Sequence, residues 1–402
     1  MAGGPGSYLI GEEERKEVLD VLESGYLFRY GSEDDPAFKQ KCVTFEKEFA
    51  KLMGVPYCVA TSSGTGAIMA ALAALGIGAD DEVIVPGYTF IASIASIMLL
   101  NAVPVLCEID ESLTMDPNDI EHRITPKTKA IMPVHMLGNP ADLDPILAIA
   151  KKHDLFVLED CCQACGAMYK GNRVGTYGDI GAFSLNCFKT ISSGDGGAII
   201  TKDEDLYERA FGYHDQGHKP CRAGVEVGNR SIVGSNMRMN ELTGAVALAQ
   251  SRKLDNILGM LKEKKARLKA ALTGIDGFTF RKLNDEGECN TLITIIMDTK
   301  ERAEALTAKT GIKPISASGW HVYNNMEQIL GKKMASAYPF GQDREYHAHM
   351  LPKTDEILDR AFNISVGVVD VGLGSAMGID ITFTNEEIDA KAAEIRELLE
   401  SL

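Results

Sequence analysis

Residues 183–197 read FSLNCFKTISSGDGG and place one lysine between an apolar run and a turn rich in serine and glycine. Lys189 has two interpretations: a surface charge beside a loop, or an amine held inside a site where it reacts as a nucleophile. Ser184 precedes the lysine, and the turn GDGG follows it. A glycine-rich turn alone is weak evidence for chemistry. The choice depends on the other reactive side chains that the sequence supplies.

Two further stretches carry polar side chains at the ends of apolar runs. TSSGTGA would open a helix at Ser63, Gly64 and Thr65 with free backbone N–H groups, which suits a phosphate. An ordinary helix N-cap is the alternative there. LFVLEDCCQA ends an apolar run in Asp160, a carboxylate that needs a cation or a hydrogen bond if it is buried. The alternative for Asp160 is that it caps the next helix.

Together these features form one chemical set. Pyridoxal 5′-phosphate needs a helix N-terminus with hydroxyl donors for its phosphate, and an anion for its pyridine nitrogen. Its aldehyde needs an amine with which to form a Schiff base. The phosphate cradle comes first in the sequence, then Asp160, and then Lys189 29 residues later. The set therefore predicts pyridoxal phosphate as the cofactor.

The elements that must position these residues alternate along the chain. Helical patterns are interleaved with the strand-like runs EVIVPGY, PVLCEI, KAIMPVHM, LFVLED and IGAFSL. Such alternation indicates a mainly parallel sheet with helices on both faces, in which ligands bind at the carboxyl ends of the strands. One long helical pattern over residues 241–272 then leads into a smaller α+β part. We expect a large cofactor-binding domain with the N-terminal segment over 1–255, and the bridging helix with a small C-terminal domain over 256–402.

The composition narrows the partners and the compartment. Lys and Arg number 41 against 57 Asp and Glu, a formal charge of −16, which opposes nucleic acid or an anionic membrane as partner. Nine scattered cysteines indicate reduced thiols and a cytoplasmic protein. CCQAC (161–165) has some likeness to a metal site, but no second Cys/His pair lies at ligand spacing, so we expect no metal. We find neither a signal peptide nor an apolar run of membrane-spanning length.

The chain resembles the DegT/DnrJ/EryC1/StrS family of fold-type-I pyridoxal-phosphate enzymes, best known as sugar aminotransferases. The resemblance implies an α/β fold of that type: a large domain with a mainly parallel sheet flanked by helices, plus a smaller C-terminal α+β domain. The motifs that carry the resemblance follow one another along nearly the whole chain. They are GEEERKEVLDVLESG, SSGTGAIMAALAALGIGADDEVIVPGYTF, KAIMPVHMLGNPADLD, LEDCCQACGAMYKGNRVGTYGDIGAFSLNCFK and GSNMRMNELTGAVALAQSRKLD.

The family's roles pass to matching positions. Lys189 matches the Schiff-base lysine, which also moves the proton between the cofactor and the substrate carbon. Asp160 matches the carboxylate at the pyridine nitrogen. Gln163 matches the residue at the O3′ side of the ring, and Phe90 the aromatic residue that stacks on the ring.

The remaining matches concern the phosphate and the assembly. Gly64, Thr65 and Ser184 match phosphate ligands. Asn236 matches an asparagine that reaches a phosphate in the neighbouring subunit, so the resemblance implies a homodimer with shared active sites. Some relatives carry histidine in place of the lysine and run dehydrations, so Lys189 favours transamination.

The resemblance implies glutamate or glutamine as the amino donor and a keto or aldehyde sugar as the acceptor. Two stretches, SGYLFRYG (24–31) and SGWHVYNNMEQIL (318–330), resemble a subgroup that acts on keto-sugar acids and cyclic polyols. Within that subgroup, the amino acceptor that we expect first is 3,8-dideoxy-8-oxo-manno-octulosonate. Two alternatives stay open. One is a dehydratase or decarboxylase with the same cofactor, and the other is an inactive binding or regulatory homologue.

Three residues are candidates for substrate contact. Arg29 could grip a carboxylate of the substrate or the donor, and a surface arginine is the alternative. Trp320 and His321 could lie against a sugar ring, and packing at a domain edge is the alternative. The sequence HDQGH has Gln216 where the family often has a histidine, so the substrate side departs from the family pattern.

Overall fold

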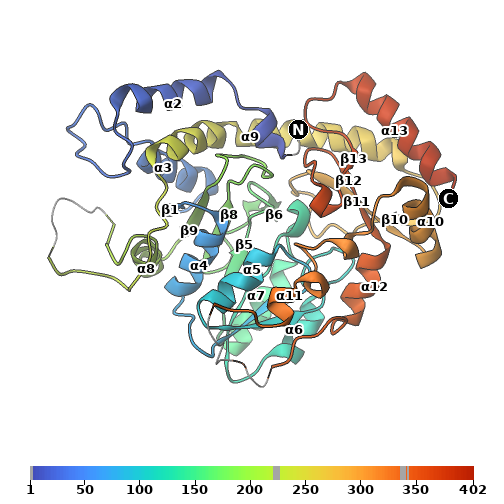
Figure 1. Ribbon diagram of the computed structural model, residues 1–402, viewed down its shortest axis with the longest axis horizontal. Helices are drawn as coiled ribbons and strands as arrows, with labels where there is room; N and C mark the ends of the chain where they lie inside the picture. Colours follow the sequence, from blue (N-terminus) through green and yellow to red (C-terminus); the bar gives the residue numbers. More distant parts are fainter. Residues whose placement is uncertain (1–2, 221–226, 336–340, 342–343) are drawn as a thin grey trace.

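A seven-stranded sheet forms the centre of the computed structural model, which describes residues 3–220, 227–335, 341 and 344–402 (Figure 1). Its strands are β1 (Tyr57–Thr61), β2 (Glu82–Pro86), β3 (Val103–Cys107), β4 (Thr128–Ile131), β5 (Phe156–Asp160), β8 (Ile180–Ser184) and β9 (Gly197–Thr201). Their spatial order is β1-β9-β8-β5-β4-β2-β3. All neighbours in this sheet pair in parallel except the two pairs that involve β9. The expectation of a mainly parallel sheet is confirmed.

Helices cover both faces of the sheet and bury its strands. One apolar cluster joins the sheet to α3 (Lys41–Met53), α6 (Pro117–Arg123), α7 (Leu143–His153) and α9 (Glu241–Leu272). The other joins it to α4 (Gly64–Ala74), α5 (Ile91–Leu99) and α8 (Glu204–His214). In β1, Cys58 and Ala60 face the first cluster and Val59 faces the second. Burial on both faces explains why these strands are continuous apolar runs.

The long helix α9 runs beside both parts of the molecule (Figure 1). It begins after Asn240, whose side chain accepts a hydrogen bond from the N–H of Thr243. It packs against α2 (Glu12–Ser24), α3 and the C-terminal helix α13 (Asn385–Glu400). The short α1 (Pro5–Tyr8) precedes α2. The predicted domain boundary after residue 255 falls inside α9.

A four-stranded sheet forms the smaller C-terminal part, and with the helices beside it this confirms the expected α+β character. Its order is β10 (Phe278–Phe280), β11 (Leu292–Met297), β12 (Ala361–Ser365) and β13 (Met377–Gly378). The helices of this part are α10 (Lys300–Thr310), α11 (Glu327–Leu330), α12 (Pro352–Arg360) and α13. A two-stranded hairpin of β6 (Met168–Tyr169) and β7 (Asn172–Arg173) completes the strands of the described residues, and the 3₁₀ turns are η1 (Met136–Gly138), η2 (Ile315–Ala317), η3 (Tyr323–Asn325) and η4 (Val371–Leu373).

None of the helices in the described part is both long and apolar enough to cross a bilayer. The eight cysteines of the described residues are all free thiols, and Cys221 lies outside those residues.

Candidate active site

Four strand ends meet at one cavity of about 500 Å³. β1, β2, β5 and β8 point the same way in the sheet, so the segments that follow them reach the same edge. All the predicted site residues except Arg29 and Asn236 line this cavity. They are Ser63, Gly64, Thr65, Phe90, Asp160, Gln163, Ser184, Lys189, Trp320 and His321.

Lys189 follows β8 in a turn that presents its amine to the cavity. Its backbone N–H donates to the carbonyl of Asn186 at 2.9 Å, which holds the turn. The side chain is half-buried, and its Nζ lies 6.0 Å from the centroid of the Phe90 ring. The lysine is therefore an amine inside a site, beside an aromatic face, and not a surface charge.

Asp160 is a buried carboxylate at the end of β5. Its Oδ2 accepts a hydrogen bond from the hydroxyl of Ser93 at 2.7 Å, and its Oδ1 accepts from the N–H of Cys162 at 3.0 Å. Among the described residues no cationic side chain forms an ion pair with it. A buried carboxylate without a cation is costly, and a protonated pyridine nitrogen in the cavity would supply the missing positive charge.

The start of α4 fits a phosphate. Ser63 caps this helix, because its Oγ accepts from the N–H of Gly66 at 3.0 Å. The N–H groups of Gly64 and Thr65 belong to the first turn and have no partner within the helix. A Cβ at Gly64 would lie 2.6 Å from the Cβ of Ser184, so only glycine lets the helix start approach the end of β8. The N-cap and the phosphate site are therefore compatible at this turn.

The C-terminal part closes the cavity over Phe90. The N–H of Thr89 donates to the carbonyl of His321 at 2.9 Å, and the N–H of Ile91 donates to that of Trp320 at 2.8 Å. The rings of Phe90 and His321 lie 5.4 Å apart. Burial, and then the charge of Lys189, lower the pKa of His321 to about 3, so its imidazole is neutral. Trp320 remains 56% exposed at the cavity.

The sequence interpretation missed several cavity residues, above all Ser93. It lies in the first turn of α5, within the mostly apolar run IASIASIML, and its hydroxyl donates to Asp160. A hydroxyl inside an otherwise apolar buried helix was the available signal, because such a group needs a partner. Asp195 and Asp370 also line the cavity.

Arg29 lies outside this cavity. Its side chain is 1% exposed, and it donates to Glu46 at 2.7 Å and to the carbonyl of Ala60 at 3.1 Å. His214 lies 3.1 Å from the guanidinium through its Nε2. Burial lowers the pKa of Arg29, but the attractions of Glu46, Tyr30 and Cys42, together with the hydrogen bond to Glu46, outweigh it and raise the pKa. The guanidinium of Arg29 therefore bonds to Glu46 of α3 and Ala60 of β1 inside the protein. It lies neither at the surface nor in the cavity that contains Lys189.

The segment HDQGH also bonds within the chain. Asp215 accepts a 2.7 Å hydrogen bond from the hydroxyl of Tyr30 and forms an ion pair with Arg238. Gln216 accepts from the same arginine at 3.2 Å. Asn236 forms a backbone bridge with Asp215, is exposed and does not line the cavity of its own chain.

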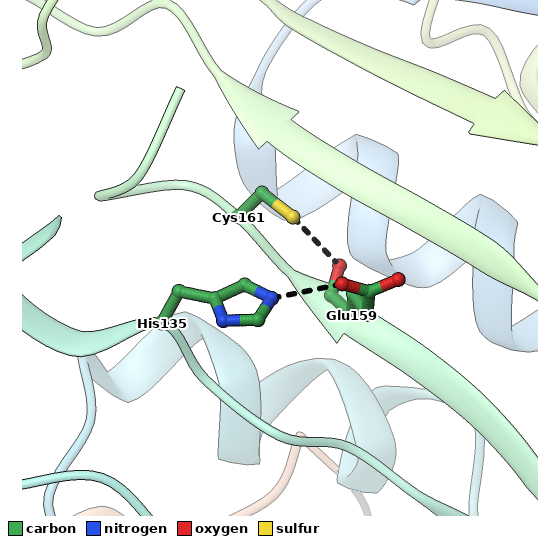
Figure 2. Close-up of side chains that lie close together, drawn as sticks. All are labelled: His135, Glu159 and Cys161. Carbon is green, nitrogen blue, oxygen red and sulfur yellow. Dashed lines mark hydrogen bonds and ion pairs between the residues drawn. The ribbon is translucent and has the colours of Figure 1, made fainter. Parts of the chain in front are cut away.

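A buried cluster of His135, Glu159 and Cys161 lies behind the end of β5, and Figure 2 shows its contacts. His135 donates from Nε2 to Glu159 at 3.1 Å, since its Nδ1 accepts from the N–H of Ala141. Glu159 also accepts from three N–H groups in the 175–178 turn. Burial raises the pKa of the Cys161 thiol well above its usual value. The histidine and the carboxylate are fully hydrogen-bonded and the thiol is protonated, so the cluster supports the strand end.

This arrangement defines a class. The sheet is mainly parallel, and helices cover both of its faces. At its strand ends lie a lysine, a helix N-terminus and a carboxylate that has no cation partner among the described residues. These features are those of the large domain of a fold-type-I pyridoxal-phosphate enzyme. Within that class, the chain belongs to the DegT/DnrJ/EryC1/StrS aminotransferase family, whose sequence pattern matches residues 9–368. The resemblance expected from the motifs is confirmed.

Relatives in this family act on different substrates. The chain is 40% identical over 252 residues to GDP-perosamine synthase of Escherichia coli O157:H7, and this match covers 62% of this chain and 66% of that protein. It is 38% identical over 325 residues to L-glutamine:2-deoxy-scyllo-inosose aminotransferase of Streptoalloteichus tenebrarius, which covers 75% and 74%. Its structure is similar to that of 3-amino-5-hydroxybenzoic acid synthase, with a TM-score of 0.81 and 28% identity over the whole of both chains. The match thus spans about two thirds of the first relative's length.

Proposed function

We propose that this chain binds pyridoxal phosphate in the cavity and transfers an amino group from glutamate or glutamine to the ketone or aldehyde of a sugar or cyclic polyol. One observation carries the proposal: Lys189 lines the same cavity as the carboxylate of Asp160, which has no cation partner among the described residues. The bound cofactor would supply an electron sink for the substrate carbon. The family and the structural similarity support the same reaction class.

The residues of the chain divide the work. Lys189 would hold the cofactor's aldehyde carbon and carry a proton to and from the substrate carbon. Asp160 would keep the proton on the pyridine nitrogen. Phe90 would cover one face of the ring and exclude water from it. Ser63, Gly64, Thr65 and Ser184 would hold the phosphate at the start of α4.

We also propose a homodimer in the cytoplasm. Asn236 is exposed and lies away from the cavity of its own chain, which is consistent with a contact to the phosphate in a partner subunit. The free thiols of the described residues favour a reducing compartment. Size measurement with and without an Asn236→Ala change tests the assembly, and cofactor retention tests the contact.

The acceptor is the finer question. The names of the two relatives point to a nucleotide-linked sugar and to an inosose, and 3,8-dideoxy-8-oxo-manno-octulosonate is the sugar acid to test beside them. Specificity in such folds lies in loops, which differ among relatives. An acceptor panel with labelled glutamate and glutamine therefore decides both the donor and the acceptor.

The test begins with the cofactor. Reconstituted protein should absorb visible light, and borohydride reduction with peptide mapping should place the adduct on Lys189. Glutamate or glutamine should then convert the cofactor to its aminated form without release of carbon dioxide. Carbon dioxide release would instead support the decarboxylase alternative. Absence of the visible band would support the inactive homologue.

A further inference from the structure

The amide of Gln163 has a fixed orientation. Its Oε1 accepts a hydrogen bond from the backbone N–H of Leu137 at 3.0 Å. A backbone N–H can only donate, so the amide oxygen faces this turn and the NH₂ group is left for other partners. Gln163 lines the cavity together with Lys189. The side chain therefore offers the cavity a donor, which suits an oxygen that carries negative charge.

The peptide that orients Gln163 is itself held by a cation. Arg281 donates from one guanidinium nitrogen to the carbonyl of Met136 at 3.2 Å and from the other to that of Leu137 at 3.0 Å. The carbonyl of Met136 and the N–H of Leu137 belong to one peptide group. A cation at the oxygen of a peptide polarises it and strengthens its N–H as a donor. Charge at Arg281 thus reaches Gln163 through a single peptide.

The turn needs this support. Leu137 has φ 56° and ψ 29°, a left-handed conformation that is unfavourable for a residue with a Cβ. The two hydrogen bonds from Arg281 and the bond to Gln163 lie on either side of it. A further bond joins the N–H of Cys289 to the carbonyl of Gly138 at 3.0 Å. The segment between β10 and β11 therefore fixes a strained turn of the large domain.

Arg281 is positioned by two buried charges. It follows β10 and is 4% exposed, and it contacts Glu288 at 3.1 Å. Glu288 also bonds to Lys265 of α9, and both are buried. Two cations face one carboxylate here, and the two terminal guanidinium nitrogens of Arg281 also donate to the peptide oxygens of the turn. A buried ion cluster is by itself weak evidence for stability. What this cluster holds in place is Arg281 beside the Met136–Leu137 peptide.

We propose that Arg281 is a positioning residue of the active site, which acts through the Met136–Leu137 peptide to orient and polarise the Gln163 amide as a donor to the cofactor's ring oxygen. The inference rests on the proposed function. It gives the C-terminal part a role in tuning the cofactor. Lys265 and Glu288 are the supports of Arg281 in this role.

The test uses the full-length protein and pyridoxal phosphate as the probe. We expect Arg281→Met to raise the cofactor's dissociation constant about tenfold, which corresponds to about 1.4 kcal/mol. The pH midpoint of the visible band should rise, because a weaker donor leaves more negative charge on the ring oxygen beside the titrating nitrogen. Arg281→Lys keeps the charge but loses the forked contact, so its dissociation constant and pH midpoint should lie between those of the wild type and those of Arg281→Met. Arg267→Met, which removes an exposed ion pair with Asp389, is the matched control.

A double-mutant cycle separates this role from a structural one. In a Gln163→Ala background, Arg281→Lys and Arg281→Met should cause no further shift of the pH midpoint, since the amide that they act through is gone. An equal shift in that background, or an unchanged midpoint and dissociation constant in the single variants, overturns the proposal. If Arg281→Met does not fold, the same cycle with Arg281→Lys decides. A wild-type protein without the visible band would refute the proposed function itself, which is a separate outcome.

Discussion

The hydroxyl of Ser93 donates a 2.7 Å hydrogen bond to Oδ2 of Asp160, and the hydroxyl of Thr89 lies 2.7 Å from the Ser93 oxygen. Because Ser93 gives its single proton to the carboxylate, Thr89 donates to Ser93. Two hydroxyls from the start of α5 therefore form a relay that ends on the carboxylate. The position of this charge is set by hydrogen bonds from the large domain, which leaves the carboxylate free to meet a cation in the cavity.

Ser93→Ala should weaken this arrangement. We expect the free energy of unfolding to fall by about 1–3 kcal/mol, the cost of removing a buried hydrogen bond to a charged group. The half-reaction with glutamate should also slow, because the carboxylate loses an orienting contact. Ser96→Ala is the control: Ser96 is buried on the same helix, and its hydroxyl has no partner among the described residues. Denaturant unfolding of both variants would contradict the relay if their losses were equal.

Asp160→Asn should separate charge from shape. The amide keeps the size of the side chain but cannot hold a proton on a pyridine nitrogen, so we expect the glutamate half-reaction to slow roughly 10²-fold or more. Asp160→Ala should slow it at least as much. Rapid-mixing absorbance measures the rate. Asp195→Asn makes the same charge change at an exposed position of the cavity and should leave the rate near the wild-type value. A normal rate for Asp160→Asn would exclude the assigned role.

Lys189→Ala should abolish turnover and the visible band while the apoprotein stays folded. The site needs the amine of this half-buried side chain, and little packing is lost with it. Absorbance after reconstitution and the thermal midpoint of the apoprotein are the measurements. Lys202→Ala, at an exposed lysine that donates to the carbonyl of Thr176, should keep the band. Ordinary activity in Lys189→Ala would show that another amine reacts.

The sequence was informative where chemistry and strand ends coincide. Buried parallel strands are apolar runs, and the polar residue that ends such a run lies at the ligand edge of the sheet. The sequence alone therefore predicts that Asp160 and Lys189 belong to one site, and both line the cavity. The sequence also predicts the helix that starts at Gly64, because Ser63 and the small residues after it are typical of a helix N-terminus.

Other features depend on contacts between distant segments. The apolar run of β9 is the same whether the strand is parallel or antiparallel, so its reversed direction could not be read from composition. The burial of Arg29 depends on Glu46, which α3 brings beside it only after folding. The contact of Arg281 with Met136 joins residues 145 positions apart. In each case the local sequence permits several outcomes, and tertiary packing selects one.

Arg29→Met should reveal a structural residue. Its loss leaves Glu46, whose side chain is only 13% exposed, without its cation, and breaking a buried pair on one side costs about 3–5 kcal/mol. Adding Glu46→Gln should recover part of this loss, because the amide oxygen can still accept from the N–H of Ala60, which now donates to Glu46 at 2.7 Å. Denaturant unfolding of the single and double variants gives the coupling. A raised KM for the amino donor with unchanged stability would instead support the carboxylate-gripping role expected from the sequence.

Two buried histidines should make the protein less stable in mild acid. Burial is the main cause that lowers the pKa of His214 and of His321 to about 3, from an ordinary value near 6.5. Between these values the unfolded chain binds protons that the folded chain does not. The free energy of unfolding therefore falls as the pH drops below 6.5, by about 1.4 kcal/mol per pH unit for each histidine once the unfolded form is fully charged.

The contribution of each histidine can be read from the slope of stability against pH. His214→Gln and His321→Gln should each flatten the decline between pH 6 and pH 4, whatever their effect on stability at pH 7. His122→Gln, at an exposed histidine, should keep the wild-type slope. Urea unfolding at several pH values measures all three. If the slope stayed unchanged in the two buried variants, the imidazoles would have to be charged in the folded state, and His321 would then face Lys189 as a second cation in the cavity.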